Sequence, residues 1–239
     1  MAPLIEARNL RFRYEDGTPA LNGLDFSLLA GETVAVLGAN GSGKTTFALH
    51  LNGLLQGEGH LEVCGVRLDH KTVSQIRTKV GLVFQDSESQ LFMPTVLEDV
   101  AFGLLNRGMD ANSARARALE ALEHVGMKSA AGKAPYHLSA GEKKRAAIAG
   151  ILAMDPEILV LDEPTTSLDP PAQRALAELL RKLPQAKILV THDIPFALAL
   201  CSRAVFFREG LIVAEGSVAE VAAQFDWRFA AEQPAACER

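Results

Sequence analysis

The chain has 239 residues, of which 48% are hydrophobic and 22% charged, so it can bury a substantial core and is not disordered as a whole. Its 24 basic and 29 acidic residues give a net charge of −5, which argues against a broad basic face for nucleic acid. The longest apolar runs fall far short of the roughly 18 residues of a membrane span, and three widely separated cysteines fit neither a disulfide framework nor a zinc site.

Two kinds of strand are predicted along the chain. Residues 10–15 (LRFRYE) and 24–28 (LDFSL) alternate between apolar and polar side chains, which is typical of half-buried antiparallel strands. Residues 34–37, 158–161 and 188–190 form short continuous apolar runs rich in β-branched residues. Such runs indicate strands that are buried on both faces of a parallel sheet.

Helical periodicity appears between these strands. Apolar residues recur at helical spacing over 118–125 and 176–183, and the second pattern is bracketed by prolines. Strands that alternate with helices predict an α/β sheet. The segment 86–150 lacks convincing buried strands and is predicted to be a helical insert, in which residues 135–141 form a loop that feeds a helix starting near Gly141.

A phosphate-binding loop follows the first buried strand. Residues 38–45 read GANGSGKT and match the pattern G-x-x-x-x-G-K-[ST] in full, between a strand and a helical stretch. Glycines let successive backbone N–H groups turn toward phosphate oxygens, Lys44 adds a positive charge, and the Thr45 hydroxyl is suited to Mg²⁺. The predicted nucleotide-binding residues of this segment are Gly38, Ala39, Asn40, Gly41, Ser42, Gly43, Lys44, Thr45 and Thr46.

Two acidic residues end the buried strand 158–161. Asp162 is positioned to hold Mg²⁺ through its water shell, and Glu163 to polarise an attacking water as a general base. Beside a complete phosphate loop, this pair predicts hydrolysis of a nucleoside triphosphate.

Five further short motifs occur in a fixed order around these two. One of them resembles the LSGGQ signature of the ABC transporter ATPases: Leu138-Ser139-Ala140-Gly141-Glu142. It lies about 20 residues before the strand that ends in the acidic pair. The remaining matches to that family are the aromatic residue that stacks on adenine, the Q-loop glutamine, the D-loop and the switch histidine, at Tyr14, Gln85, Ser167-Leu168-Asp169 and His192 respectively.

The resemblance implies an α/β fold of the ABC type: a phosphate-loop NTPase nucleotide-binding domain with a RecA-like core, an antiparallel β subdomain and a helical subdomain. A single domain of residues 1–239 is expected. The core and the β subdomain would comprise residues 1–85 and 151–232, the helical subdomain residues 86–150, and a tail residues 233–239.

The same resemblance assigns roles to residues. Glu163, His192 and Gln85 would be catalytic, and Thr45, Gln85 and Asp162 would hold Mg²⁺. ATP would also contact Tyr14, Ser139, Gly141, Glu142 and Asp169. The signature departs from the family at two places: Ala140 replaces a glycine, which is tolerable if its φ is negative, and Glu142 replaces a glutamine and puts a carboxylate near the ATP.

Family members of this kind dimerise head to tail, because the signature loop and the phosphate loop of one chain are too far apart to share a phosphate. Each ATP is then held between the phosphate loop of one protomer and Ser139 and Gly141 of the other, with Asp169 linking the two sites. Because both halves of the site look competent in this sequence, a homodimer is the simpler expectation.

Residues 84–92 and 143–150 resemble the energy-coupling-factor group of these ATPases, particularly its cobalt and nickel uptake branch. The resemblance implies a peripheral motor subunit on the cytoplasmic face of the cell membrane, working with a transmembrane coupling subunit and a substrate-binding membrane subunit. Glu88 and Gln90 would line the cleft that grips a coupling helix of the membrane partner.

The six histidines are scattered, so the membrane partner would bind the metal. No charged-then-apolar leader opens the sequence, so no secretory signal is expected.

Two alternatives stay open. One is an importer for another micronutrient, such as a vitamin. The other is a non-transport ABC switch acting on DNA or ribosomes. DNA-repair members interrupt the cassette with long coiled coils, but Lys44 and Ser139 are only 95 positions apart here. Translation-type members carry two cassettes in one chain, and this chain holds one. A plain nucleotide-binding regulatory module would need neither Glu163 nor His192.

Overall fold

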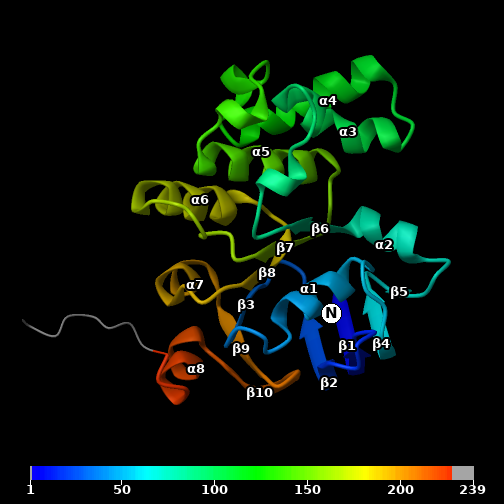
Figure 1. Ribbon diagram of the computed structural model, residues 1–239, viewed down its shortest axis with the longest axis vertical. Coiled ribbons are helices and arrows are strands. Elements are labelled where there is room, and N and C mark those ends of the chain that lie inside the picture. Colours follow the sequence, from blue (N-terminus) through cyan, green and yellow to red (C-terminus); the bar gives the residue numbers. More distant parts are fainter. Residues whose placement is uncertain (1, 228–239) are drawn as a thin grey trace, which may run out of the picture.

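The computed structural model describes residues 2–227, which form two β-sheets covered by helices (Figure 1). The larger sheet has six strands: β3 (Thr33–Gly38), β6 (Val80–Val83), β7 (Ile158–Asp162), β8 (Ala186–Val190), β9 (Arg203–Arg208) and β10 (Leu211–Gly216). Their order in space is β10-β9-β3-β8-β7-β6. All neighbouring pairs are parallel except β9 and β10, which form an antiparallel hairpin at one edge.

The smaller sheet is antiparallel and has the order β2-β1-β4-β5. Its strands are β1 (Ile5–Arg13), β2 (Pro19–Leu28), β4 (Glu58–Val63) and β5 (Val66–Arg67). Along β2, Leu24, Phe26 and Leu28 are buried while Asp25 and Ser27 are exposed. The alternation read from the sequence therefore corresponds to one packed and one solvated face.

Eight α-helices connect and cover the strands in the described part of the chain. They are α1 (Lys44–Leu51), α2 (Val73–Lys79), α3 (Val96–Asn106), α4 (Ala111–His124), α5 (Ala140–Ala153), α6 (Pro170–Lys182), α7 (Ile194–Leu200) and α8 (Val218–Gln224). Helices α3, α4 and α5 pack against one another in the segment between β6 and β7 and form the upper part of Figure 1. Within residues 2–227, none of the helices combines the length and apolar character needed to cross a bilayer.

The parallel strands contribute to two apolar cores, one on each face of the larger sheet. On β7, Ile158 and Val160 pack with α1 and the antiparallel sheet, whereas Leu159 and Leu161 pack toward the helices α3 to α6. All four side chains are at most 1% exposed. This explains why the sequence of β7 is continuously apolar, since neither face meets water.

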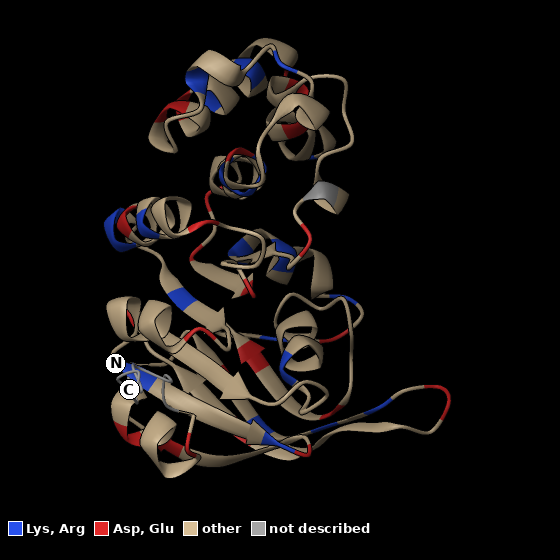
Figure 2. Cartoon of the chain, turned by 60° about the vertical axis from the view of Figure 1, so that its left-hand side comes forward, with Lys and Arg blue, Asp and Glu red and all other residues tan. Residues whose placement is uncertain are grey.

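Polar side chains fix where the helices of the upper layer begin. Thr95, Asp110 and Ser139 are the N-cap residues of α3, α4 and α5, and each side chain accepts a hydrogen bond from a backbone N–H of the first turn. Close packing is helped by Gly103 on α3, where a Cβ would lie 2.7 Å from the Met154 sulfur. In the view of Figure 2, Lys and Arg are interspersed with Asp and Glu along these helices.

The structure adds elements that the sequence analysis did not predict. The β9–β10 hairpin is the largest of them, although two runs of β-forming residues joined at Glu209-Gly210 are a recognisable hairpin signal. The segment predicted as a loop at residues 135–141 contains a 3₁₀ turn, Pro135–His137. The tail expected at residues 233–239, including Cys237, lies outside the described residues.

Candidate nucleotide-binding site

The phosphate loop joins β3 to α1, and two of its glycines are required by geometry. Gly38 has φ 141°, and a Cβ there would lie 2.3 Å from the Phe207 carbonyl oxygen. Gly43, the N-cap of α1, has φ 103°, and a Cβ would lie 2.4 Å from the Ala20 carbonyl oxygen. Any side chain at these positions would be strained and would displace neighbouring backbone. The loop conformation therefore requires glycine at both Gly38 and Gly43, because the backbones of β9 and β2 lie directly against them.

Lys44 arches back over the loop that precedes it. Its Nζ donates hydrogen bonds to the carbonyl oxygens of Gly38, at 2.7 Å, and Ala39, at 2.9 Å, and the residue is 6% exposed. Burial lowers the pKa of the ammonium, while the nearby carboxylates of Glu163 and Asp162 oppose that shift. The charge is thus held in the concavity of the loop, where it can exchange a carbonyl for a phosphate oxygen.

The acidic pair lies at the carboxyl end of β7. Asp162 is 4% exposed, and burial raises the pKa of its carboxyl, helped by the charge of Glu163 and opposed by a hydrogen bond from Thr45. Its Oδ1 is buried and has no hydrogen-bond partner among the described residues. A hydroxyl beside a buried carboxylate with an open oxygen fits the donor set that Mg²⁺ takes in phosphate-loop proteins.

Glu163 is held in a conformation that is uncommon for its residue type. Its φ is 44°, and its backbone N–H donates to the Val190 carbonyl oxygen at 2.8 Å. The side chain meets His192, which follows β8: Oε2 lies 2.8 Å from Nδ1 of the ring and 3.4 Å from the His192 backbone nitrogen. Glu163 is almost buried, whereas the His192 side chain is 64% exposed. The pair therefore presents a shielded carboxylate and an accessible imidazole.

An aromatic group lies at the other end of the cleft. Tyr14 is 41% exposed, and its hydroxyl is 2.9 Å from the Thr46 Oγ1 on α1. Phe12 packs edge-on against Tyr14, with ring centroids 5.0 Å apart, and also against the buried ring of His50, at 4.8 Å. The Tyr14 ring is thus fixed at its polar end and supported on one side, as a platform for a base would need to be.

These parts surround one cleft of about 830 Å³. Its lining joins most of the residues that the sequence analysis singled out to several that it did not: Tyr14, Thr18, Pro19, Ala20, Ala39, Asn40, Gly41, Gly43, Lys44, Thr45, Thr46, Gln85, Asp162, Glu163, His192 and Trp227. Two further residues of the loop, Gly38 and Ser42, are buried and do not line the cleft. The contacts of these residues with ATP or Mg²⁺ remain predictions.

Trp227 is one of the lining residues that sequence reasoning missed, with Thr18, Pro19 and Ala20. It lies after α8, and its ring packs edge-on against Phe206, which in turn stacks on Phe225 at 3.8 Å. No motif surrounds it, so the only available signal is that it is the sole tryptophan of the chain.

The signature residues Ser139, Gly141 and Glu142 are not among the described residues that line this cleft. Ser139 Oγ accepts from the Glu142 N–H at 3.3 Å, and the Glu142 carboxylate accepts from the Ser139 N–H at 2.8 Å, which completes a capping box. The pattern S-x-x-E could have predicted this use of Glu142. Ala140 is the first residue of α5 and is not among the positive-φ residues, so its side chain is accommodated.

The D-loop residues Ser167, Leu168 and Asp169 are also not among the described residues that line this cleft. Ser167 has φ 64°, and Asp169 is the N-cap of α6, where its Oδ1 accepts from the Ala172 N–H at 2.9 Å. The role of Asp169 between two sites stays a prediction.

The Q-loop differs from expectation at Gln90. Gln85 lines the cleft, but the Gln90 side chain turns inward instead of facing a partner. Its Oε1 accepts from the Phe84 N–H at 3.0 Å, and its Nε2 donates to the Leu82 carbonyl oxygen at 3.2 Å. The backbone of Glu88 is in a 3₁₀ turn, Glu88–Gln90, and its side chain lies outside the described part of the structure. Gln90 is therefore occupied by its own chain.

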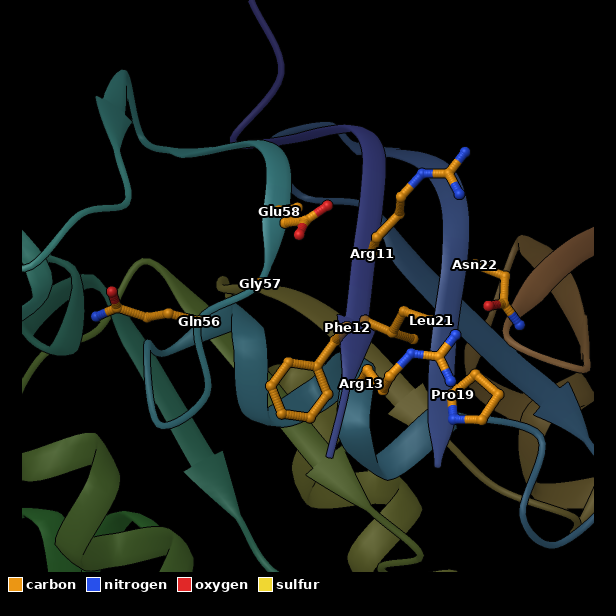
Figure 3. A pocket seen from close by; sticks show the side chains of 9 residues that line it. All are labelled: Arg11, Phe12, Arg13, Pro19, Leu21, Asn22, Gln56, Gly57 and Glu58. Atoms are coloured by element: carbon orange, nitrogen blue, oxygen red, sulfur yellow. The ribbon is translucent and has the colours of Figure 1, made fainter. Parts of the chain in front are cut away.

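A second hollow, of about 560 Å³, lies on the antiparallel sheet (Figure 3). Arg11 and Arg13 extend from β1 on the side opposite to Phe12, near Pro19 and Asn22 of β2. Arg11 donates to the Asn9 side chain and Arg13 to the Gly17 carbonyl. Both guanidinium groups thus have local partners. Pro19 lines this hollow and the nucleotide cleft alike.

Comparison with known proteins places this geometry in a family. Residues 21–166 match the family model of the ABC transporter. The "Energy-coupling factor transporter ATP-binding protein EcfA" of Methanothermobacter thermautotrophicus is 47% identical over 224 residues, covering 91% of this chain and 72% of the relative.

Two solved structures are similar in fold as well. cbiO1 from Clostridium perfringens, described as part of the ABC transporter complex cbiONQ, has a TM-score of 0.83 and 35% identity over 95% of this chain and 93% of that one. An ATP-binding cassette solved as a dimer in a post-hydrolysis state, bound to ADP and phosphate, has a TM-score of 0.80 and 30% identity over 90% and 98% of the two chains.

The chain belongs to the ABC transporter family, and it is an ATP-binding cassette ATPase with the mixed α/β fold of that family. Within the family, it is a relative of the energy-coupling-factor ATP-binding proteins, three of which are 44% to 47% identical to it. The resemblance inferred from the motifs is thereby confirmed.

Proposed function

We propose that this chain is the ATP-hydrolysing motor subunit of an energy-coupling-factor importer for cobalt or nickel ions, bound peripherally at the cytoplasmic face of the membrane. The observation that carries the motor role is the assembly of Lys44, Asp162, Glu163 and His192 in one cleft. The importer role is supported by the identity to energy-coupling-factor relatives, and the choice of metal by residues 84–92 and 143–150 and the likeness to cbiO1.

In this proposal each side chain has a distinct task. The loop and Lys44 hold the phosphates, and the shielded Glu163 carboxylate accepts a proton from the attacking water. His192 orients Glu163 through the 2.8 Å contact and can hydrogen-bond the γ-phosphate from its exposed side. Bound Mg²⁺, held by Thr45, Gln85 and Asp162, would supply charge neutralisation at the β- and γ-phosphates.

A second copy of the chain completes the site. The cleft presents the phosphate loop openly, and Ser139 is exposed at the start of α5 with an O–H that can donate. A head-to-tail homodimer would bring the Ser139 and Gly141 of one copy to the phosphate held by the other.

Complementation tests the homodimer. Lys44→Ala destroys the phosphate loop and Ser139→Arg the signature, so each variant alone should be inactive. In a mixture about a quarter of the sites pair an intact loop with an intact signature, and ATPase activity should return to about that fraction if the two lesions act as independent halves of a site. A mixture as inactive as its components, with chains shown to exchange, would contradict the homodimer.

The membrane partner is proposed to dock on an apolar surface here called the Phe92 patch. It is formed by Phe92, which precedes α3, and by Phe102 and Leu105 in the second half of α3. Phe92 is 62% exposed, packs edge-on against Phe102 at 4.9 Å, and follows the Q-loop closely in sequence. Its backbone N–H is fixed by the Asp99 carboxylate at 2.9 Å. An exposed aromatic pair held rigidly is suited to an apolar helix of a partner.

Docking and cargo can be tested together. Phe92→Glu should abolish co-purification with the membrane subunits and metal uptake in cells while leaving nucleotide binding intact. Leu198→Glu, at a 54% exposed position on α7, is the matched control. Assembly and transport of the Phe92 variant at the control level would overturn the docking surface. Uptake of a vitamin instead of cobalt or nickel would overturn the cargo but keep the motor role.

A further inference from the structure

Lys144 is a fully buried lysine on α5, the helix that begins with the signature. It is 2% exposed, and its Nζ donates to the carbonyl oxygens of Gln85, at 2.9 Å, and Phe84, at 3.2 Å. A buried ammonium is costly unless it is hydrogen-bonded and paired. Burial lowers the pKa of the Lys144 ammonium to about 8, and the carboxylates of Asp86 and Asp162 oppose that shift. The residue therefore joins the helical layer to the first residues of the Q-loop.

A second side chain clamps the same backbone from the other direction. Gln90 accepts from the Phe84 N–H and donates to the Leu82 carbonyl, at the point where β6 ends. The N–H and the C=O of Phe84 are thus both held by side chains, one from the Q-loop and one from α5. With its peptide fixed in this way, Gln85 has its side chain placed at the edge of the nucleotide cleft.

Lys144 reaches from α5 to the Q-loop beside a cavity that both segments line. A cavity of about 300 Å³ opens between Gln85 to Ser87, the first two turns of α5, and residues Thr166 and Ser167. The hydrogen bonds of Lys144 are a direct polar connection between α5 and the Q-loop. A movement of α5 would therefore act on the Gln85 peptide through these hydrogen bonds.

We propose that Lys144 is a positioning residue that sets Gln85 for hydrolysis and ties it to the signature of the same chain. α5 is a single helix of 14 residues, with Ser139 at its N-cap and Lys144 little more than one turn later. When Ser139 contacts the phosphate held by a second copy, Lys144 carries that displacement to Gln85 at the other site of the dimer. This inference rests on the proposed role of Gln85 and on the head-to-tail dimer.

A double-mutant cycle between Lys144→Met and Gln85→Ala tests the positioning role. Methionine keeps most of the buried aliphatic chain and removes the donors. We expect Lys144→Met to lower kcat about tenfold or more, because a misplaced group in an active site costs up to about 100-fold, while KM for ATP stays within about twofold. The double variant should be no slower than Gln85→Ala alone, since both changes remove the same contribution.

A purely structural role for Lys144 predicts a different result. Losses that multiply in the double variant, or a kcat equal to that of the wild type, would overturn the proposal. Lys182→Met, an exposed lysine on α6, is the control and should leave kcat unchanged. If Lys144→Met does not fold, the cycle is run with Gln90→Leu, which removes the other half of the clamp at a half-buried position and should show the same lack of additivity with Gln85→Ala.

The two proposals fail in distinguishable ways. An inactive wild-type protein, with or without membrane subunits, would contradict the proposed function. An active wild type with multiplying losses contradicts the Lys144 inference alone.

Discussion

The phosphate-loop region and the signature region of this chain contrast in burial and in how their polar groups are used. Lys44, Asp162 and Glu163 are 6%, 4% and 8% exposed, and they converge on one cleft from the start of α1 and the carboxyl end of β7. Ser139 is exposed at the start of α5, and its hydrogen bonds run to Glu142 of its own first turn.

The two regions therefore obtain their geometry from different levels of structure. The phosphate-loop region is preorganised by the fold, because β3, β7 and β8 are neighbours and their carboxyl ends meet. The signature region is preorganised only as a helix N-terminus, which a short sequence can specify locally. Its proposed partner has to come from another chain.

The largest expected effect is in the phosphate-loop region. Glu163→Gln should lower kcat by about 100-fold or more, because general-base catalysis contributes about 10²–10⁴-fold, while ATP binding persists and dimer formation with ATP increases. Single-turnover hydrolysis and size-exclusion chromatography with and without ATP measure both. Turnover near the wild-type level would remove Glu163 from the role of base.

A smaller effect is expected in the signature region. Ser139→Ala should lower kcat at saturating ATP but leave the affinity of the isolated chain for ATP unchanged, because its proposed contact is with a phosphate held by a second copy. The lost N-cap should also reduce the free energy of unfolding by about 1 kcal/mol. Equilibrium binding and urea unfolding test the two statements. A large loss of ATP affinity in the isolated chain would break the contrast between the regions.

The buried His50 in the last turn of α1 offers a pH test confined to the phosphate-loop region. Its Nδ1 donates to the Thr46 carbonyl at 2.7 Å, and burial lowers the pKa of the ring. A lowered pKa means that the unfolded chain binds the proton more readily, so stability is complete above pH 6.5, the ordinary value, and falls as pH drops below it.

The loss should be at most about 1.4 kcal/mol for each pH unit below that value. His50→Gln should reduce the slope of melting temperature against pH between pH 7.5 and 5.5, compared with His60→Gln at a more exposed position. Equal slopes in wild type and His50→Gln would show that other groups control acid stability.

The smallest effect is optical. Trp227 is the sole tryptophan and lines the nucleotide cleft, so ATP should change its fluorescence in the isolated chain. The same change should occur in Ser139→Ala, because the reporter lies on the phosphate-loop side. A response that requires an intact signature would place Trp227 at the contact between two copies instead.

The sequence by itself determined the parts whose chemistry is local. The glycines and Lys44 of residues 38–45, the acidic end of β7 and the apolar character of the parallel strands are all dictated by adjacent residues, so a single stretch is sufficient to recognise each one. The family motifs around them added Tyr14, Gln85 and His192, which the structure brings into the same cleft.

Only the tertiary structure decided which residues join across long separations. Lys144 meets the Q-loop 59 positions earlier, Trp227 reaches the cleft from the end of α8, and Gln90 turns inward to the backbone of β6. The sequence alone assigns these three residues only to the surface or the core. Their hydrogen bonds and ring contacts are set by tertiary packing and have no fixed spacing in the sequence.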